Sequence, residues 1–275
     1  MIKVNTLQYN KYKEREGRMD YLYWFTKKTN KKSSSTRFIE LDILRGFAII
    51  FMVILHILWD LDYFNILPLN ISVYQFNIIV PTMFFLLVGI CLAVTNNRPS
   101  SSKTTPYLRT IQRGAWVFTL GMILTLLTAL ALPDRPILFG VLHCIGLSMI
   151  LALPFLRFKS YNIIIAGGII FIGVLIASIP VQNPTILQMA LGFHARDIFT
   201  QTIDYFPILP WIGVCLLGVG LGNILYKDNK RKFSFPDLSR YTPAKFFSWL
   251  GRHSLAIYLL HQPIIAGALF VFFKI

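Results

Sequence analysis

The stretch that decides the fold runs from Arg45 to Leu67 and reads RGFAIIFMVILHILWDLDYFNIL. It is almost continuously apolar after Arg45, and at 1.5 Å of rise per residue it is long enough to cross a hydrocarbon core of about 30 Å. His56 and Asp60 are among the ionisable side chains that interrupt it. Because such groups are costly in lipid, the stretch predicts a membrane-spanning helix with a functional site inside it.

Six further apolar stretches of similar length follow, each bounded by charge or proline. Together with Gly46–Leu67 they predict an all-α membrane protein, a polytopic bundle of about seven transmembrane helices. A shorter apolar stretch, Thr185–Phe193, is interpreted as an interfacial or re-entrant turn, although an eighth crossing there remains open. The six long stretches are Tyr74–Thr95, Gly114–Leu132, Ile137–Leu156, Asn162–Pro180, Phe206–Tyr226 and His253–Phe273.

The composition agrees with a membrane protein. Hydrophobic residues make up 55% of the chain and charged residues 14%, whereas soluble domains average roughly 45–50% and 25%. The 27 Lys and Arg outnumber the 12 Asp and Glu, which gives a net charge of +15. A nucleic-acid binder would not need this much Leu, Ile and Phe, so we predict no nucleic-acid partner.

The distribution of the basic residues predicts the topology. All of them except Arg135, Arg196 and Lys274 fall on one side of the seven-span arrangement. The positive-inside rule places that side, and with it the N-terminus, in the cytoplasm. We therefore predict a multi-pass protein of the cell (plasma) membrane, in contact with membrane lipids. Residues 1–36 are predicted to be a flexible basic cytoplasmic segment that precedes a membrane domain over 37–275, and a homo-oligomer is left open.

The first predicted span carries a candidate acid–base pair. His56 follows Arg45 by about 16 Å of helix rise, which places it near the bilayer midplane. Asp60 follows His56 at i+4, so both share one helix face and the carboxylate can contact the imidazole. Such a contact would fix the tautomer of His56 and raise its basicity, as a general base requires. An equally weighted alternative is that His56 only hydrogen-bonds a neighbouring helix.

Two more histidines, His143 and His261, lie inside predicted spans and could converge with His56. No His-x-x-x-His spacing or carboxylate cluster accompanies them, so no metal is expected. Prolines within or beside the spans predict broken helices around a central polar pocket, because unpaired backbone groups are tolerated in a membrane only where they line a cavity. These prolines are Pro81, Pro207, Pro210 and Pro263.

The motifs in these spans resemble the catalytic-domain family of heparan-α-glucosaminide N-acetyltransferase. The spacing of Arg45 and His56 is also similar to that of the acyltransferase family 3 membrane enzymes. Four blocks in order carry the resemblance: Arg37 to His56, the segment NIIVPTMFFLLVG from Asn77 to Gly89, GVLHCIG from Gly140 to Gly146, and LGRHSLAIYLLHQP from Leu250 to Pro263.

This resemblance implies a membrane acyltransferase that takes an acetyl or other acyl group from cytoplasmic acyl-CoA, with acetyl-CoA as donor. The acceptor would be an amino sugar, a glycan or a lipid-linked molecule. Carried over by position, His56 is the candidate general base and Arg45 a partner for CoA phosphate or the acyl carbonyl. Asp60 and His261 join the catalytic set. Asp42, His143 and Trp211 are the further candidates for cofactor binding.

Two other functions compete with this one. A proton-coupled small-molecule transporter would also need intramembrane His and Asp and broken helices, and an assembly subunit would need no chemistry at all. No Ser or Cys stands in a nucleophile motif, which favours direct transfer in a ternary complex, while an acyl-histidine intermediate stays open.

Overall fold

The computed structural model describes residues 37–67, 78–97, 106–227 and 230–273. The predicted N-terminal segment, residues 1–36, lies outside the described residues. One compact unit begins at Phe38 and contains all the elements described below.

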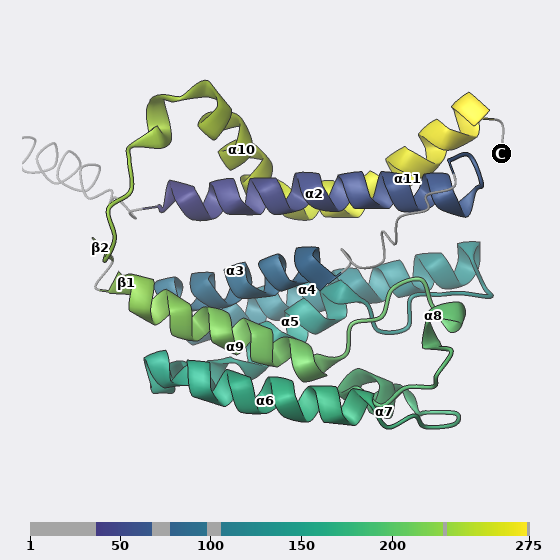
Figure 1. Cartoon of the computed structure of the whole chain (residues 1–275), viewed down its shortest axis with the longest axis horizontal. Helices are drawn as coiled ribbons and strands as arrows, with labels where there is room; N and C mark the ends of the chain where they lie inside the picture. Colours follow the sequence, from purple (N-terminus) through teal and green to yellow (C-terminus); the bar gives the residue numbers. More distant parts are fainter. Residues whose placement is uncertain (1–36, 68–77, 98–105, 228–229, 274–275) are drawn as a thin grey trace, which may run out of the picture. The chain divides into compact units, whose positions relative to one another are not determined.

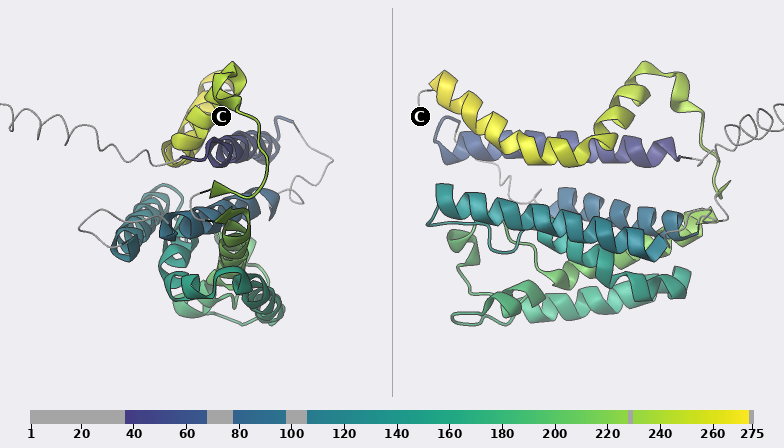
Figure 2. Two further views of the ribbon diagram at one scale, coloured as in Figure 1. Left: turned by 90° about the vertical axis from the view of Figure 1, so that its left-hand side faces the viewer. Right: turned by 180° about the vertical axis from the view of Figure 1, so that it is seen from behind.

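Helices make up most of this unit (Figures 1 and 2). The long ones are apolar because they present side chains to lipid or to each other rather than to water. The elements are α2 Ile39–Tyr63, α3 Ile79–Asn96, α4 Pro106–Ala131, α5 Val141–Leu151, the 3₁₀ helix η2 Leu153–Tyr161, α6 Asn162–Ala177, α7 Ile186–Leu191, α8 Ile198–Gln201, α9 Ile208–Leu225, the strands β1 Tyr226–Lys227 and β2 Lys230–Arg231, η3 Leu238–Arg240, α10 Thr242–Arg252 and α11 Ser254–Phe273.

Six segments in the described part of the chain are long and apolar enough to cross a membrane: α2, α3, α4, η2 with α6, α9 and α11. This confirms an all-α multi-pass membrane protein, but not the count of seven. The stretch Ile137–Leu156, predicted as one span, is divided between the 11-residue α5 and the start of η2. Pro154 lies in the first turn of η2, and because proline has no N–H to donate, the α-helix ends before it. A central polar pocket is likewise not confirmed.

Of the helix breaks predicted at prolines, the structure shows one and not the others. Pro263 lies inside a continuous α11, and Pro81 lies in the first turn of α3, where a missing N–H costs nothing. Only the region before Trp211 is distorted, since Leu209 has non-helical dihedral angles at the start of α9. The apolar stretch at Thr185–Phe193 contains α7, whose six residues are too short to cross.

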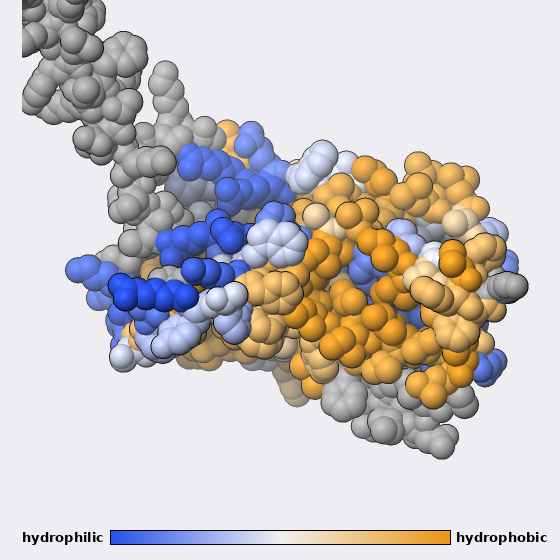
Figure 3. All heavy atoms as spheres, turned by 90° about the horizontal axis from the view of Figure 1, so that it is seen from above, coloured by the Kyte–Doolittle hydropathy of each residue, from blue (hydrophilic) through white to orange (hydrophobic). Residues whose placement is uncertain are grey.

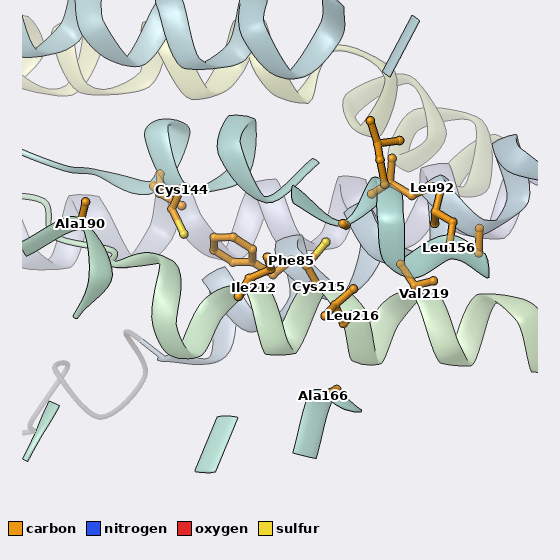
Figure 4. Close-up of a cluster of buried hydrophobic side chains, with 14 of the residues drawn as sticks. Phe85, Leu92, Cys144, Leu156, Ala166, Ala190, Ile212, Cys215, Leu216 and Val219 are labelled. Atoms are coloured by element: carbon orange, nitrogen blue, oxygen red, sulfur yellow. The ribbon is translucent and has the colours of Figure 1, made fainter. Parts of the chain in front are cut away.

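The main core lies where α9 packs against α3, α5 and α6 (Figure 4). Small residues allow the close approach: a side chain on Gly218 would overlap the carbonyl of Leu86, and one on Gly89 would overlap that of Cys215. Packing of this kind is typical of helices in membranes, where small residues let backbones meet. Phe85, Cys215, Leu216 and Val219 are completely buried in this core.

A second contact joins α10 to α2. A side chain on Gly46 would overlap the carbonyl of Phe247, and one on Gly251 would overlap that of Asp42. The two glycines therefore let the backbones of α2 and α10 touch directly, and α11 follows α10 after one residue, His253.

Hydrophilic side chains gather at one end of this unit, as Figure 3 shows for one face, and the strands with Lys227, Lys230 and Arg231 lie there. It is the end where α2 begins and α9 passes into β1 and β2. There Arg231 donates to both carboxylate oxygens of Glu40, at 2.6 and 2.7 Å, and Tyr226 donates to the same carboxylate at 3.1 Å. The bond to Glu40 raises the pKa of Arg231 above its usual value. We call this the basic end; its predicted cytoplasmic location stays a prediction.

Candidate functional site

Two histidines from α2 and α11 meet in the half of the unit away from the basic end. The ring centroids of His56 and His261 lie 4.6 Å apart, edge to face. His56 is half-buried and His261 is 9% exposed. The sequence predicted that the intramembrane histidines could converge, and the structure brings together these two.

Each of the two rings uses one nitrogen to bond its own helix. Nδ1 of His56 lies 2.9 Å from the carbonyl oxygen of Met52, and Nδ1 of His261 lies 2.6 Å from that of Tyr258. Because a carbonyl only accepts, Nδ1 must carry the hydrogen in the neutral form of both rings. Nε2 is then left with a lone pair, and in His261 it is buried without a hydrogen-bond partner among the residues that the structure describes. This is the tautomer in which Nε2 can accept a proton.

A buried carboxylate lies on the same helix. Asp60 is 2% exposed, and both of its oxygens accept from Nε2 of Gln262 at 3.0 Å. Gln262 directly follows His261 in α11. His261 contacts the imidazole of His56, and Gln262 bonds the carboxylate of Asp60, one turn further along α2. The expected direct bond from Asp60 to His56 is replaced by this contact, and the two groups act on each other through space.

His143, in α5, forms hydrogen bonds in a different pattern from His56 and His261. Its Nδ1 accepts from the backbone N–H of Gly140 at 3.2 Å, so Nε2 carries the hydrogen in the neutral ring and faces Oγ1 of Thr125 at 3.4 Å. Both ring nitrogens thus have partners within the protein. The side chain is 2% exposed and holds the first turn of α5, where backbone N–H groups lack helical partners.

Asp204, in the loop before α9, also bonds the first turn of α5, and together with His143 it forms what we call the α5 cap. Its Oδ2 accepts from the N–H of Val141 at 3.0 Å, and a side chain on Gly140 would overlap the same oxygen. Burial raises the pKa of Asp204 to about 6, although the bond from Val141 and the attraction of His56 hold it lower than burial alone would. His143, Asp204 and Tyr258 of α11 line one small pocket with Gly121, Leu124, Ile137, Gly140 and Leu142.

Tyr258 connects the two groups of polar residues. Its ring centroid lies 5.6 Å from that of His261, and its side chain also lines the pocket with His143 and Asp204. The histidine pair and the α5 cap are therefore neighbours that share one tyrosine, but they use their polar atoms differently.

The candidates for cofactor binding do not form one group. Arg45 lies at the basic end, where its guanidinium donates to Asp42 at 3.2 Å, to the carbonyl of Gly251 at 3.3 Å and to the sulfur of Cys91 at 3.2 Å. Asp42 and Arg45 thus form an ion pair. Trp211 instead packs in the core, with ring centroids 5.2 Å from Phe85 and 5.1 Å from Phe206.

Three residues of the site were not singled out from the sequence: Gln262, Tyr258 and Asp204. Gln262 and Tyr258 carry a signal, since each is a polar side chain in an apolar span near His261. Asp204 is a carboxylate between Ile203 and Tyr205 in a stretch outside the spans, where a charge needs no explanation, so only the fold reveals its contact with α5.

In the described part of the chain, no group of three or more His, Cys, Asp or Glu side chains is placed to hold a metal ion. Neither a curated protein nor a solved structure matches the chain. A family model described as the catalytic region of heparan-alpha-glucosaminide N-acetyltransferase matches residues 37–263. The match covers α2 to the first half of α11, and with it every residue of the site described above. The chain therefore belongs to the heparan-alpha-glucosaminide N-acetyltransferase catalytic family.

Proposed function

We propose that this chain is an integral membrane acyltransferase that moves an acetyl group from acetyl-CoA to an acceptor, with His56 as the general base. The family implies a membrane acetyltransferase that uses an acyl-CoA and a sugar acceptor. For this chain we propose an amino-sugar, glycan or lipid-linked acceptor. The transporter alternative gains no support from the family.

The observation that carries the proposal is the pairing of His56 and His261. His56 is half-buried, so a substrate can reach its Nε2, while Nδ1 is held by Met52. A general base needs both an accessible lone pair and a fixed ring. Asp60, buried one turn away, would stabilise the positive charge that His56 gains, and Gln262 holds that carboxylate in place.

The proposed reaction is direct. The acceptor nitrogen or oxygen attacks the thioester carbonyl carbon while His56 Nε2 takes its proton. A new bond from carbon to nitrogen or oxygen forms, the carbon–sulfur bond breaks, and CoA leaves as a thiolate that receives the proton. His261, whose ring packs edge to face against that of His56, would hold the base in its orientation. Transfer through an acyl-histidine stays open as an alternative.

Acyl-CoA would approach from the basic end, which we propose is cytoplasmic. Arg45 is only partly buried, since its side chain is 24% exposed, and its guanidinium is held in position by Asp42. Arginine suits a phosphate group because it is always charged and presents several donors. We propose that Arg45 binds the CoA part of the donor and that the pantetheine arm extends along α2 toward His56. His143 and Trp211 are not included, because both are engaged within the protein.

The test is transfer of label from radiolabelled acetyl-CoA to a membrane extract by the purified protein in detergent, together with thermal melting in the presence of CoA. We expect labelled product and a higher melting temperature with CoA. No label transfer together with no stabilisation by CoA would reject the acyltransferase.

Arg45→Ala tests the donor site separately. We expect the KM for acetyl-CoA to rise about tenfold, which corresponds to one charge-assisted contact of about 1.4 kcal/mol. Arg109→Ala, on the N-terminal turns of α4, is a control that keeps the overall charge equal. An Arg45→Ala enzyme with unchanged KM and kcat would show that the arginine has only a structural role.

A further inference from the structure

The helix α10 has two unlike faces. Ala244, Ser248 and Gly251 are buried against α2. Lys245, Trp249 and Arg252 follow at i, i+4 and i+7, which places them along one exposed stripe about a quarter turn around the helix from the buried residues.

The exposed face combines aromatic rings with positive charges. Phe246 is 53% exposed and Trp249 is 49% exposed, while Tyr241, directly before the helix, is 62% exposed. Lys245 and Arg252 are also exposed and flank the tryptophan along the stripe. A face meant for water would not keep three large rings outside, and a face meant for the hydrocarbon core would not carry two cations.

The position of α10 decides between these environments. It stands at the basic end, and Arg45 of α2 donates to the carbonyl of Gly251 near its last turn. It is also separated by a single residue from α11, which is long and apolar enough to span. The helix therefore lies where membrane segments reach the bilayer surface, at the level where Trp and Tyr rings are enriched and lysines meet phosphate groups.

We infer that the exposed face of α10 binds the anionic phospholipid headgroups of the bilayer that the chain spans, with Trp249 and Phe246 at the interface and Lys245 and Arg252 on the lipid phosphates. Figure 3 shows the face of the molecule on which hydrophilic side chains of this end adjoin the hydrophobic band. This surface is independent of the proposed transfer chemistry, because none of its four side chains contacts His56 or His261.

The test uses the full chain in lipid nanodiscs, either of phosphatidylcholine or of phosphatidylcholine with phosphatidylglycerol. Brominated lipids quench tryptophan fluorescence and so report the depth of Trp249 in the bilayer. The contribution of Trp249 is the part of the quenching that is present in the wild type and lost in Trp249→Phe. We expect that component to be quenched most by bromines near the headgroups, and more strongly in anionic discs. No quenching of this component by any brominated lipid would overturn the inference and would point to water or a protein partner.

The role of the two cations on α10 is tested with the double variant Lys245→Glu/Arg252→Glu. The control is Lys230→Glu/Lys232→Glu, which makes the same change in charge at the same end of the unit, in and directly after β2. Anionic lipid should raise the melting temperature of the wild type and of the β2-region pair, by about 2–4 °C relative to the α10 pair. If both pairs lose this stabilisation equally, α10 is no specific lipid site. Lys245→Ala/Arg252→Ala is the milder version should charge reversal prevent folding. Adding CoA should leave the difference in melting temperature between the two double variants unchanged. If CoA abolishes this difference, Lys245 and Arg252 bind CoA and not lipid.

Discussion

His56 and His143 are both imidazoles in apolar helices of the same unit, yet their ring nitrogens are used in opposite ways. His56 is bonded to its own helix through Nδ1, and its Nε2, on a half-buried ring, has no hydrogen bond to any residue that the structure describes. His143 is buried and has a partner for each nitrogen, on Gly140 and Thr125. The difference suggests a rule for histidines in apolar helices: we expect chemistry only where a ring nitrogen is left over after the local backbone has been bonded.

The largest effect should come from His56→Ala. Removal of a general base lowers turnover by about 10²–10⁴-fold, so acetyl transfer should fall by that factor while CoA still raises the melting temperature. His253→Ala, which removes an exposed imidazole, serves as the matched control and should transfer normally. Wild-type turnover in the His56→Ala enzyme would remove His56 from the mechanism.

His143→Ala should cost stability rather than chemistry. It leaves the N–H of Gly140 without its acceptor and opens space in a buried site, so the free energy of unfolding should fall by about 3 kcal/mol. Chemical denaturation in detergent measures this loss, and turnover below the melting temperature should stay within a few-fold of the wild type. A stable His143→Ala protein without activity would contradict the contrast drawn between the two histidines.

Asp204→Asn should change the dependence of stability on pH. Burial raises the pKa of Asp204 from 3.8 to about 6, so the folded state holds this proton more tightly than the unfolded state. The wild type therefore loses stability as the pH rises from about 4 to above 6, where the loss levels off because the carboxyl is then ionised in both states. The loss should be about 2 kcal/mol, less than the full shift implies, because the side chain is partly exposed to solvent.

The asparagine can still accept from Val141 and carries no charge. Melting curves from pH 4 to 8 should show Asp204→Asn more stable than the wild type above pH 6, with the gap closing toward pH 4. A gap that is the same at every pH would mean that the carboxylate is not the cause.

Gln262→Leu, next to the pair of His56 and His261, should have the smallest effect. It leaves the buried carboxylate of Asp60 without its donor, so we expect kcat to fall about tenfold with little change in the KM for acetyl-CoA. Gln201→Leu is the control, since Gln201 makes the equivalent bond to Asp197 at an exposed site. An equal loss in both variants would indicate damage to folding instead of misplacement of Asp60.

Much of this arrangement follows from the sequence, because apolar length and charge distribution are local properties. They predicted the helical membrane fold and the spans around α2, α3, α4, α6, α9 and α11, and the motifs predicted the family. The span at Ile137–Leu156 was predicted by apolar length alone, which does not report that Pro154 ends α5 early. Likewise α10 was hidden, since its 11 residues are too short and too mixed to register as a span.

The site was predictable in part. His56, Asp60 and His261 were chosen because ionisable groups in lipid need a reason to be there, and the structure places them close together. The same argument selected His143. It could not distinguish the two cases, since the bond from Gly140 depends on how the chain turns into α5, and the contact with Thr125 depends on how α4 packs against α5. The bond from Gln262 to Asp60 joins positions 202 residues apart, a separation over which no local pattern extends.

The glycine contact between α2 and α10 has a consequence for the histidine pair. His56 stands ten residues after Gly46, and His261 stands ten residues after Gly251, so the two chains leave the glycine contact in parallel and reach the imidazoles after equal lengths of backbone. A shift of α10 along α2 by one residue would carry the start of α11 about 1.5 Å along α2. The alignment of the two rings therefore depends in part on a contact some three turns away, beside Arg45, and we expect an alanine or valine at Gly46 or Gly251 to displace the rings without touching either histidine.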